Sequence, residues 1–318
     1  MTKDSAGTLR IAAGCNPPDI WFNSFMVILT GALICLDLLL AHHVQLVGFD
    51  RLLSAVPSML VLLGVLCYCI WRPLPKLVGL CEVTFYGILL YGALGALALG
   101  IGRVPDVLKD TQLAAADRFF HFQTASVVHL VEHFPALNHL LAMIYQSLSA
   151  FAVLAIFLPV LAGPRIASRR LVLQVTFAGL ATAGLFALLP AAGPWTTEGL
   201  SPSGEQAHIS ESLARMRVPG TMDIADANGG IVAFPSFHVI LAILSACALG
   251  SVRFLRIPAW IYCSLICFST ITTGWHYGID VVGGVVVAFC AVAAGDRVLA
   301  ALCLARAADQ LDPPLTSH

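Results

Sequence analysis

The chain has 318 residues, of which 58% are hydrophobic and 11% charged, and its formal net charge is −1. A soluble domain is about half apolar and about one quarter charged, so one water-soluble core could not bury this surplus of apolar residues. The composition therefore predicts an integral membrane protein. No basic tail or long basic run is present, and we expect no nucleic-acid partner.

Eight apolar stretches are long enough to cross a bilayer, which takes roughly 20 helical residues for a core of about 30 Å. In chain order they cover residues 25–47, 52–71, 77–101, 138–162, 171–192, 231–252, 257–275 and 277–304. The sequence thus predicts an all-α polytopic membrane protein with about eight transmembrane helices.

The short loops indicate the orientation of these helices. Three of them hold seven cations and no acid: Arg72, Lys76, Arg165, Arg169, Arg170, Arg253 and Arg256. Cations in short loops favour the cytosolic side, so both termini are predicted to be cytoplasmic and the loops 102–137 and 193–230 to face outside. We expect a multi-pass protein of a bacterial inner (plasma) membrane.

The first of these outer loops has hydrophobic residues at helical spacing over residues 112–137. The pattern predicts an interfacial helix lying on the outer face of the membrane. His129 and His133 are four residues apart, which is one spacing of metal ligands. Without a third ligand, the favoured interpretation is a solvated helix face, and we expect neither a metal site nor a cofactor.

Two polar islands interrupt the later apolar stretches. The first is Pro235-Ser236-Phe237-His238, at the outer end of the sixth stretch. A proline is tolerated in the first turn of a helix, and a helix N-terminus favours an anion. The second island is the segment STITTGWHYGID over residues 269–280, where His276 and Asp280 are four residues apart and can share a helix face.

The hairpin between the two islands predicts that they meet. The sixth stretch enters the membrane and the seventh returns, so His238 and His276 should lie at the same outer surface. Two histidines and a carboxylate fit phosphoryl transfer, in which one imidazole attacks phosphorus and the other protonates the departing oxygen. Arg215 and Arg217, in the loop that leads to Ser236, are the candidate cations for the phosphate oxygens. A solvated pair of loop arginines is the alternative.

These residues carry a resemblance to a known family. Residues 235–238 and the spacing from His276 to Asp280 resemble the second and third motifs of the type 2 phosphatidic acid phosphatase superfamily. The third motif of that family usually begins Ser-Arg, whereas this chain has Ser269 and Thr270. The first motif, Lys, six residues, Arg-Pro, is absent. Arg72-Pro73 does not supply it, because residue 65 is valine and the loop is predicted to be cytosolic.

Where the chain departs from these motifs, it resembles the branch of the superfamily that contains inositolphosphotransferases and sphingomyelin synthases. There the third block tends to read Ser-Thr-x-x-Thr-x-x-His-Tyr-x-x-Asp, which residues 269–280 fit, and PAAGPW at 190–195 resembles its proline-rich turn. The resemblance implies a six-helix catalytic core over residues 77–304, a tail and two added helices over 1–76, and a cytosolic tail over 305–318.

By the same resemblance, the protein is a lipid phosphatase or phosphotransferase that acts without metal at the extracytoplasmic face. His276 would form a phosphohistidine, with Asp280 as its partner, His238 as the acid and Ser236 holding phosphate. The implied partner is a lipid phosphate; the residues do not separate hydrolase from transferase, nor do they give the oligomeric state.

A transporter or channel is the alternative from another class. It predicts acids and histidines at several depths of the bilayer, and Asp37 and Glu82 lie inside the first and third stretches. The other polar groups gather at one surface instead, which favours the enzyme.

Overall fold

The computed structural model describes residues 19–48, 56–72, 74–103, 107–162, 165–223 and 231–311. Residues 1–18 of the predicted N-terminal tail and residues 312–318 of the predicted C-terminal tail lie outside this part, whereas residues 305–311 of the latter continue the last helix. The regular structure of this part is helical, apart from two-residue strands that pair in parallel, Leu46–Val47 (β1) with Met222–Asp223 (β2). The helices are α1 Asp19–His43, α2 Val56–Trp71, α3 Pro75–Gly102, α4 Asp110–Phe119, α5 Thr124–Glu132, α6 Pro135–Gln146, α7 Leu148–Ala162, α8 Arg165–Leu188, α9 Gly204–Met216, α10 Phe237–Leu249, α11 Arg256–Thr272 and α12 Gly278–Leu311, with 3₁₀ turns η2 Pro194–Thr196 and η4 Arg253–Leu255.

Each predicted apolar stretch contains a helix, but not every helix is long enough to span a bilayer. Within the described residues, five helices are long and apolar enough, and α6 with α7 makes a sixth if this pair, bent by 44°, is one span. α2 and α10 are shorter, with 16 and 13 residues. The polytopic fold is therefore confirmed, and the prediction of about eight spans only in part. α10 is short because the chain remains non-helical through residues 231–236, up to its N-cap Ser236.

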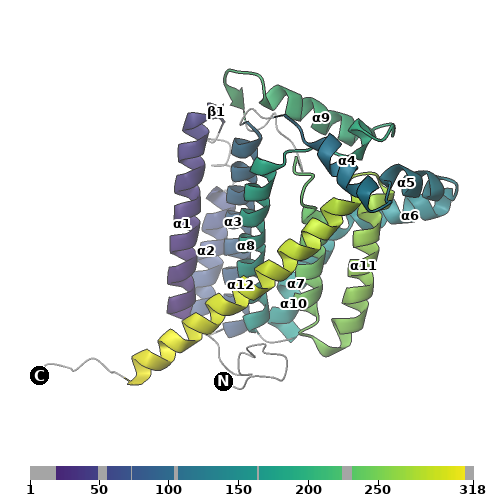
Figure 1. Ribbon diagram of the computed structural model, residues 1–318. Helices are drawn as coiled ribbons and strands as arrows, with labels where there is room; N and C mark the ends of the chain where they lie inside the picture. Colours follow the sequence, from purple (N-terminus) through teal and green to yellow (C-terminus); the bar gives the residue numbers. More distant parts are fainter. Residues whose placement is uncertain are drawn as a thin grey trace, which may run out of the picture.

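The helices form an upright bundle with shorter helices across one end (Figure 1). α1, α2, α3 and α8 stand side by side, α12 crosses the bundle obliquely, and α4, α5 and α9 lie at the end opposite to the start of α1 and the end of α12. The connections near Arg72, Lys76 and Arg253 are thus at one end of the bundle and the two polar islands at the other. This arrangement agrees with the predicted topology, while the orientation in a membrane stays a prediction.

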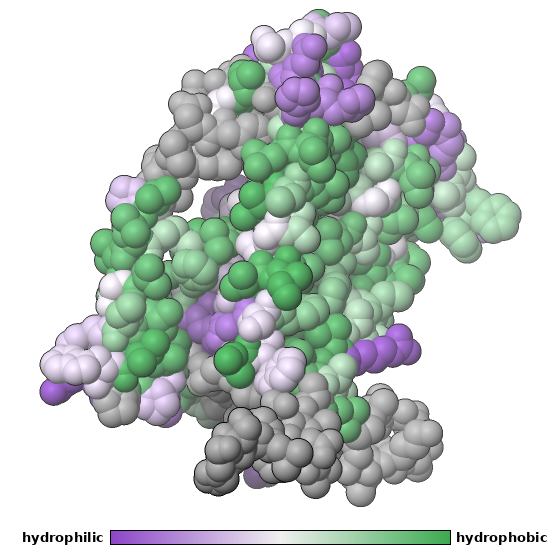
Figure 2. All heavy atoms as spheres, turned by 90° about the vertical axis from the view of Figure 1, so that its left-hand side faces the viewer, coloured by the Kyte–Doolittle hydropathy of each residue, from purple (hydrophilic) through white to green (hydrophobic). Residues whose placement is uncertain are grey.

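The surface of the bundle has the composition of a lipid-facing protein. Figure 2 shows hydrophobic side chains over the middle of one face and hydrophilic ones gathered at its upper end. On α1, Val27, Ile28 and Leu39 are among the large exposed apolar residues. Isolated exposed leucines need no explanation in a soluble protein, but a continuous apolar face indicates a membrane or a partner.

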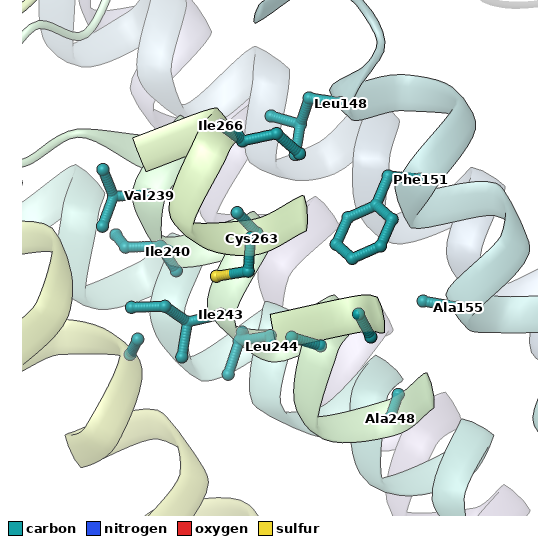
Figure 3. Close-up of a cluster of buried hydrophobic side chains, with 14 of the residues drawn as sticks. Leu148, Phe151, Ala155, Val239, Ile240, Ile243, Leu244, Ala248, Cys263 and Ile266 are labelled. Atoms are coloured by element: carbon teal, nitrogen blue, oxygen red, sulfur yellow. The ribbon is translucent and has the colours of Figure 1, made fainter. Parts of the chain in front are cut away.

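The main core surrounds α10, whose side chains pack between α7 and α11. Figure 3 shows Ile240 and Leu244 among Phe151, Cys263 and Ile266. Ile240, Leu244 and Ile266 are fully buried. Because α10 is enclosed on several sides, its first turn has a fixed place at the end of the bundle where the polar islands lie.

A buried ion pair corrects the sequence prediction for Arg169. This residue was expected in a cytosolic loop, but α8 already begins at Arg165 and Arg169 is fully buried. Its guanidinium donates to both carboxylate oxygens of Glu82 on α3, at 2.7–3.0 Å, and lies over the ring of Phe22 on α1. A buried charge is tolerated when it is paired and hydrogen-bonded. Glu82 is therefore accounted for as one half of a structural pair, which removes part of the support for a transporter.

The predicted interfacial helix over residues 112–137 is wrong as a single element. The structure has α4 and α5 there, separated by a turn in which His121 has a positive φ of 55° and Gln123 is extended. A residue with positive φ ends a right-handed helix. Phe119 and Phe120 at this turn are exposed, as expected for a segment at a membrane surface.

Candidate active site

The first polar island is fixed by the start of α10. Ser236 is the N-cap: its Oγ accepts from the backbone N–H of Val239 at 3.4 Å. The backbone N–H of Ser236 donates to the carbonyl oxygen of Asp280 at 3.1 Å. The start of α10 is therefore anchored to the first turn of α12, and the two islands meet as the hairpin predicts.

Two glycines allow this close approach. A Cβ on Gly284 of α12 would lie 2.8 Å from the carbonyl oxygen of Ser236 and 3.0 Å from Cβ of Val239, and one on Gly283 would lie 2.9 Å from the ring of Phe234. Only residues without a Cβ fit such contacts. Gly283 and Gly284 therefore permit the close packing of α12 on the start of α10.

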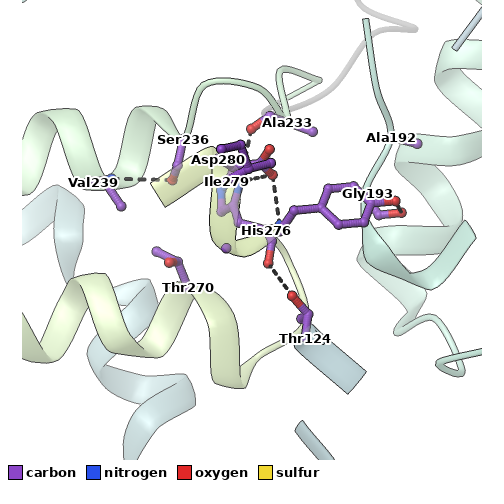
Figure 4. Close-up of polar contacts among 12 residues, drawn as sticks. Thr124, Ala192, Gly193, Ala233, Ser236, Val239, Thr270, His276, Ile279 and Asp280 are labelled. Carbon is purple, nitrogen blue, oxygen red and sulfur yellow. Dashed lines mark hydrogen bonds and ion pairs between the residues drawn. The ribbon is translucent and has the colours of Figure 1, made fainter. Parts of the chain in front are cut away.

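His276 lies in the turn between α11 and α12 and is buried. Its Nδ1 is 3.0 Å from the carbonyl oxygen of Ala233 and 3.4 Å from Oδ2 of Asp280 (Figure 4). A carbonyl oxygen can only accept, so Nδ1 carries the proton and donates it. In the neutral imidazole the lone pair is then on Nε2, which is the state that a nucleophilic histidine requires.

Burial keeps this imidazole neutral. It lowers the pKa of His276 to about 4, although the Ala233 carbonyl acts in the opposite direction. Oδ2 of Asp280 also accepts from the backbone N–H of Tyr277 at 2.9 Å. The carboxylate thus holds both the turn and the ring, and its contact with the ring is the longer of the two.

His238, in the first turn of α10, is the neighbour of His276. The two ring centroids are 5.9 Å apart, with an angle of 56° between the ring planes. The ring of His238 also stacks on that of Tyr145, with 4.2 Å between the centroids. The structure therefore brings together Ser236, His238, His276 and Asp280.

A carboxylate from a distant helix holds the histidine turn. Asp117 of α4 accepts from the backbone N–H groups of Gly278 and Ile279, both at 2.7 Å, and so caps α12 two residues after His276. Burial raises the pKa of Asp117, while the two N–H donors lower it. A negative charge at a helix N-terminus is favourable because it satisfies unpaired N–H groups and the helix dipole.

A second carboxylate joins the PAAGPW turn to this site. Asp110, the first residue of α4, accepts from the backbone N–H groups of Ala192 and Gly193 at 2.8–3.1 Å. The hydroxyl of Tyr277 lies 3.2 Å from Asp110 Oδ1, 3.1 Å from the Gly193 carbonyl and 2.8 Å from the Thr197 hydroxyl. The turn and the tyrosine noted in the sequence therefore belong to one network behind His276.

The spacing rules do not predict the roles of Asp110 and Asp117, because the acids of an outer loop are expected to be solvated. Glu198 of another outer loop is a third case: it accepts from the N–H of Ala125 at the start of α5, at 2.7 Å. A usable signal was the position of Asp110 and Asp117, seven residues apart on one face of a short helix.

Comparison with known families agrees with this geometry. A protein-family model described as the PAP2 superfamily matches residues 111–294, which is more than half of the chain. The chain belongs to the PAP2 superfamily. No curated protein and no solved structure matches it.

Membership of the PAP2 superfamily implies a phosphatase-type membrane enzyme that takes a phosphate ester. It confirms the superfamily part of the resemblance; it does not support the inositolphosphotransferase branch. The matched region runs from α4 into α12 and includes Ser236, His238, His276 and Asp280, whereas Asp110 lies one residue before it.

The arginines chosen from the sequence lie at the far end of α9. Arg217 donates to the carbonyl of Leu213, and Arg215 Nε is 3.9 Å from Glu211. The opposite end of α9 contacts the histidine turn, since Gln206 Nε2 donates to the carbonyl oxygens of residues 273 and 274 at 3.2–3.3 Å. From Gln206 to Arg215 is roughly 14 Å along a helix. These contacts do not bring either arginine to the histidines.

Residue 270, where the third motif usually has arginine, is a buried threonine. Thr270 Oγ1 donates to the carbonyl of Cys267, and Ser269 Oγ to that of Ile266. Both side chains are fully buried within α11. Residue 270 therefore contributes no cation to the site.

The histidines of the outer helices form a separate group. His129 Nδ1 is 3.0 Å from Glu132, and His133 Nδ1 is 2.6 Å from the carbonyl of His129. No cluster of three or more possible metal ligands occurs in the described ranges.

Proposed function

We propose that this protein cleaves or transfers a phosphate ester of a lipid, with His276 as the nucleophile. The observation that supports this is the hydrogen bond from Nδ1 of His276 to the Ala233 carbonyl, which leaves the lone pair on Nε2. His238, 5.9 Å away between ring centroids, is close enough to act on the same phosphate group.

The proposed reaction has two steps. Nε2 of His276 attacks phosphorus, the ester P–O bond breaks, and His238 gives a proton to the departing oxygen. An acceptor hydroxyl then attacks the phosphohistidine, the P–N bond breaks, and the acceptor proton passes to His238. Asp280 would stabilise the positive charge on His276, and the Ser236 hydroxyl would donate to a phosphate oxygen.

The acceptor decides between two activities. Water gives a phosphatase, whereas a lipid alcohol or sugar hydroxyl gives a transferase, towards which the motif variant of residues 269–280 leans. Release of inorganic phosphate, measured beside transfer to a labelled lipid acceptor, separates the two.

The test of the proposal is His276→Ala in the full chain. We expect no phosphate release or headgroup transfer from a panel of lipid phosphates, and no phosphate on the residue 276 peptide after an alkaline quench. His139→Ala, at an exposed position of α6, is the matched control. Full activity of His276→Ala would show that His276 is not the nucleophile. Loss of wild-type activity with a chelator would contradict a metal-independent mechanism.

Arg215 and Arg217 remain the proposed cations for the phosphate, on account of their charge and their place in the predicted outer segment 193–230. If they bind it, Arg217→Ala and Arg215→Ala raise KM at least tenfold with little change in kcat. Unchanged KM in both variants would remove them from the site.

We propose further that the site faces outward. The argument is that Arg72, Lys76, Arg253 and Arg256 gather at the opposite end of the bundle. A membrane-impermeant thiol reagent should then label Ser201→Cys in intact cells, and should leave Ser251→Cys unlabelled.

A further inference from the structure

A column of parallel rings stands beside the two histidines. Tyr145 of α6 stacks on His238 with 4.2 Å between centroids and 11° between planes. The ring of Trp275 is also parallel to that of Tyr145, with 5.9 Å between centroids and 5° between planes. Trp195 contacts Trp275 edge-on, with 5.6 Å between their centroids. The contacts thus run from Trp195 through Trp275 and Tyr145 to His238, which neighbours His276.

The bend after α6 accounts for the place of Tyr145. α6 and α7 meet at 44° around Ser147, whose Oγ lies 2.6 Å from the hydroxyl of Tyr262 on α11. α7 continues along α10, whereas α6 lies against α11 and α5. A straight helix would continue past α10, so the bend is what brings Tyr145 between the start of α10 and the turn that carries Trp275.

From this geometry we propose that Tyr145 is a positioning residue for the proton transfer by His238. This inference rests on the proposed function. Stacking of two aromatic rings is favourable, and here Tyr145 fixes the plane of the imidazole. An aromatic face also attracts a cation, and imidazolium is the form of His238 that donates the proton. Tyr145 would thus act through His238 and needs no contact with phosphorus.

The prediction is a dependence on the leaving group. Nitrophenolate departs without a proton, whereas an alkoxide needs one, and a general acid contributes about 10²–10⁴-fold to a rate. Tyr145→Leu should therefore lower kcat for dodecyl phosphate about tenfold or more and that for p-nitrophenyl phosphate less than threefold. Tyr145→Phe keeps the ring and should stay within about twofold of wild type for both substrates.

Three controls separate the possible failures. His238→Ala should show the same dependence on leaving group, and adding Tyr145→Leu to it should cost nothing further. Tyr91→Leu, at an exposed tyrosine of α3, should have no effect. Activity that survives His276→Ala rejects the proposed function itself, whatever Tyr145 does.

The inference about Tyr145 has its own contrary outcomes. Equal losses on both substrates, or none, in Tyr145→Leu would overturn it while the proposed function stands. If that variant does not elute like wild type in detergent, Tyr145→Met takes its place. Misfolding of both would show a structural role only and would also overturn the inference.

Discussion

The carboxylate of Asp117 lies 2.7 Å from the backbone nitrogen of Gly278, although 161 residues separate them in the chain. The second oxygen of Asp117 binds the next N–H, that of Ile279, at the same distance. Helix α12 therefore begins at a fixed point, and His276 sits two residues before it. A group on an outer helix thus sets the position of the proposed nucleophile.

Replacement of Asp117 tests this anchor. Asp117→Ala leaves two N–H groups without their acceptor, which should lower the free energy of unfolding by about 1–3 kcal/mol. It should also lower kcat, because the turn with His276 is no longer held. Thermal unfolding in detergent and turnover of dodecyl phosphate measure the two effects. Gln112→Ala, at an exposed position of the same helix, should change neither, and an unchanged kcat in Asp117→Ala would contradict the role.

The hydroxyl of Tyr277 offers a second, milder test. Tyr277→Phe removes the contacts to Asp110, Gly193 and Thr197 but keeps the buried ring. Loss of a buried hydrogen bond costs about 1 kcal/mol, so we expect a lower unfolding midpoint and a small loss of kcat. Tyr91→Phe, on the exposed side of α3, provides the comparison. A midpoint equal to that of wild type would show that the hydroxyl contributes nothing.

The meeting of His238 and His276 could be predicted from the sequence because it needs only topology. One apolar stretch enters the membrane, a short turn with Arg253 reverses it, and the next returns, so both ends share a surface. The i, i+4 spacing also predicts that Asp280 lies near His276; the two are 3.4 Å apart, although His276 lies in the turn before α12 and does not share its helix. Local spacing and hydrophobic length are enough for such relationships.

Contacts between distant segments could not be predicted in this way. The main acceptor for the His276 ring is a backbone carbonyl, that of Ala233, which leaves no trace in residue type. The sequence predicts a loop position for Arg169 because cations favour loops, whereas its pairing with Glu82 overrides that preference. The break between α4 and α5 depends on the positive φ of His121, a conformation that few residues other than glycine adopt.

Close packing of α10 on α12 gives a third prediction. Gly284→Ala would push a methyl group to 2.8 Å from the Ser236 carbonyl, so the helices must separate. Overpacking of this kind costs about 1–3 kcal/mol, and it should draw Ser236 and His238 away from His276. Phosphohistidine formation, followed by quenched flow, should fall at least tenfold.

Gly87→Ala is the matched control, since nothing lies within 4 Å of its new Cβ on α3. That variant should keep wild-type activity, because the added methyl group meets no neighbour. The helix itself should not be weakened, since alanine favours a helix over glycine by about 1 kcal/mol. Equal rates in Gly284→Ala and Gly87→Ala would show that the helix spacing does not matter for the reaction.

The low pKa of His276 predicts how the protein responds to acid. Burial lowers this pKa to about 4 from an ordinary value of 6.5. Between these values the unfolded chain binds a proton that the folded protein does not, so stability is complete above pH 6.5 and falls as pH drops towards 4. The nucleophile should likewise stay neutral and competent at pH 6.

Titration of ¹³C-labelled histidine by NMR, with the His276 signal assigned by its loss in His276→Gln, measures the pKa of His276 directly. The same substitution should flatten the fall of the unfolding midpoint between pH 6.5 and 4. A His276 signal that titrates near 6.5 would mean that the ring is hydrated, and both expectations would then be wrong.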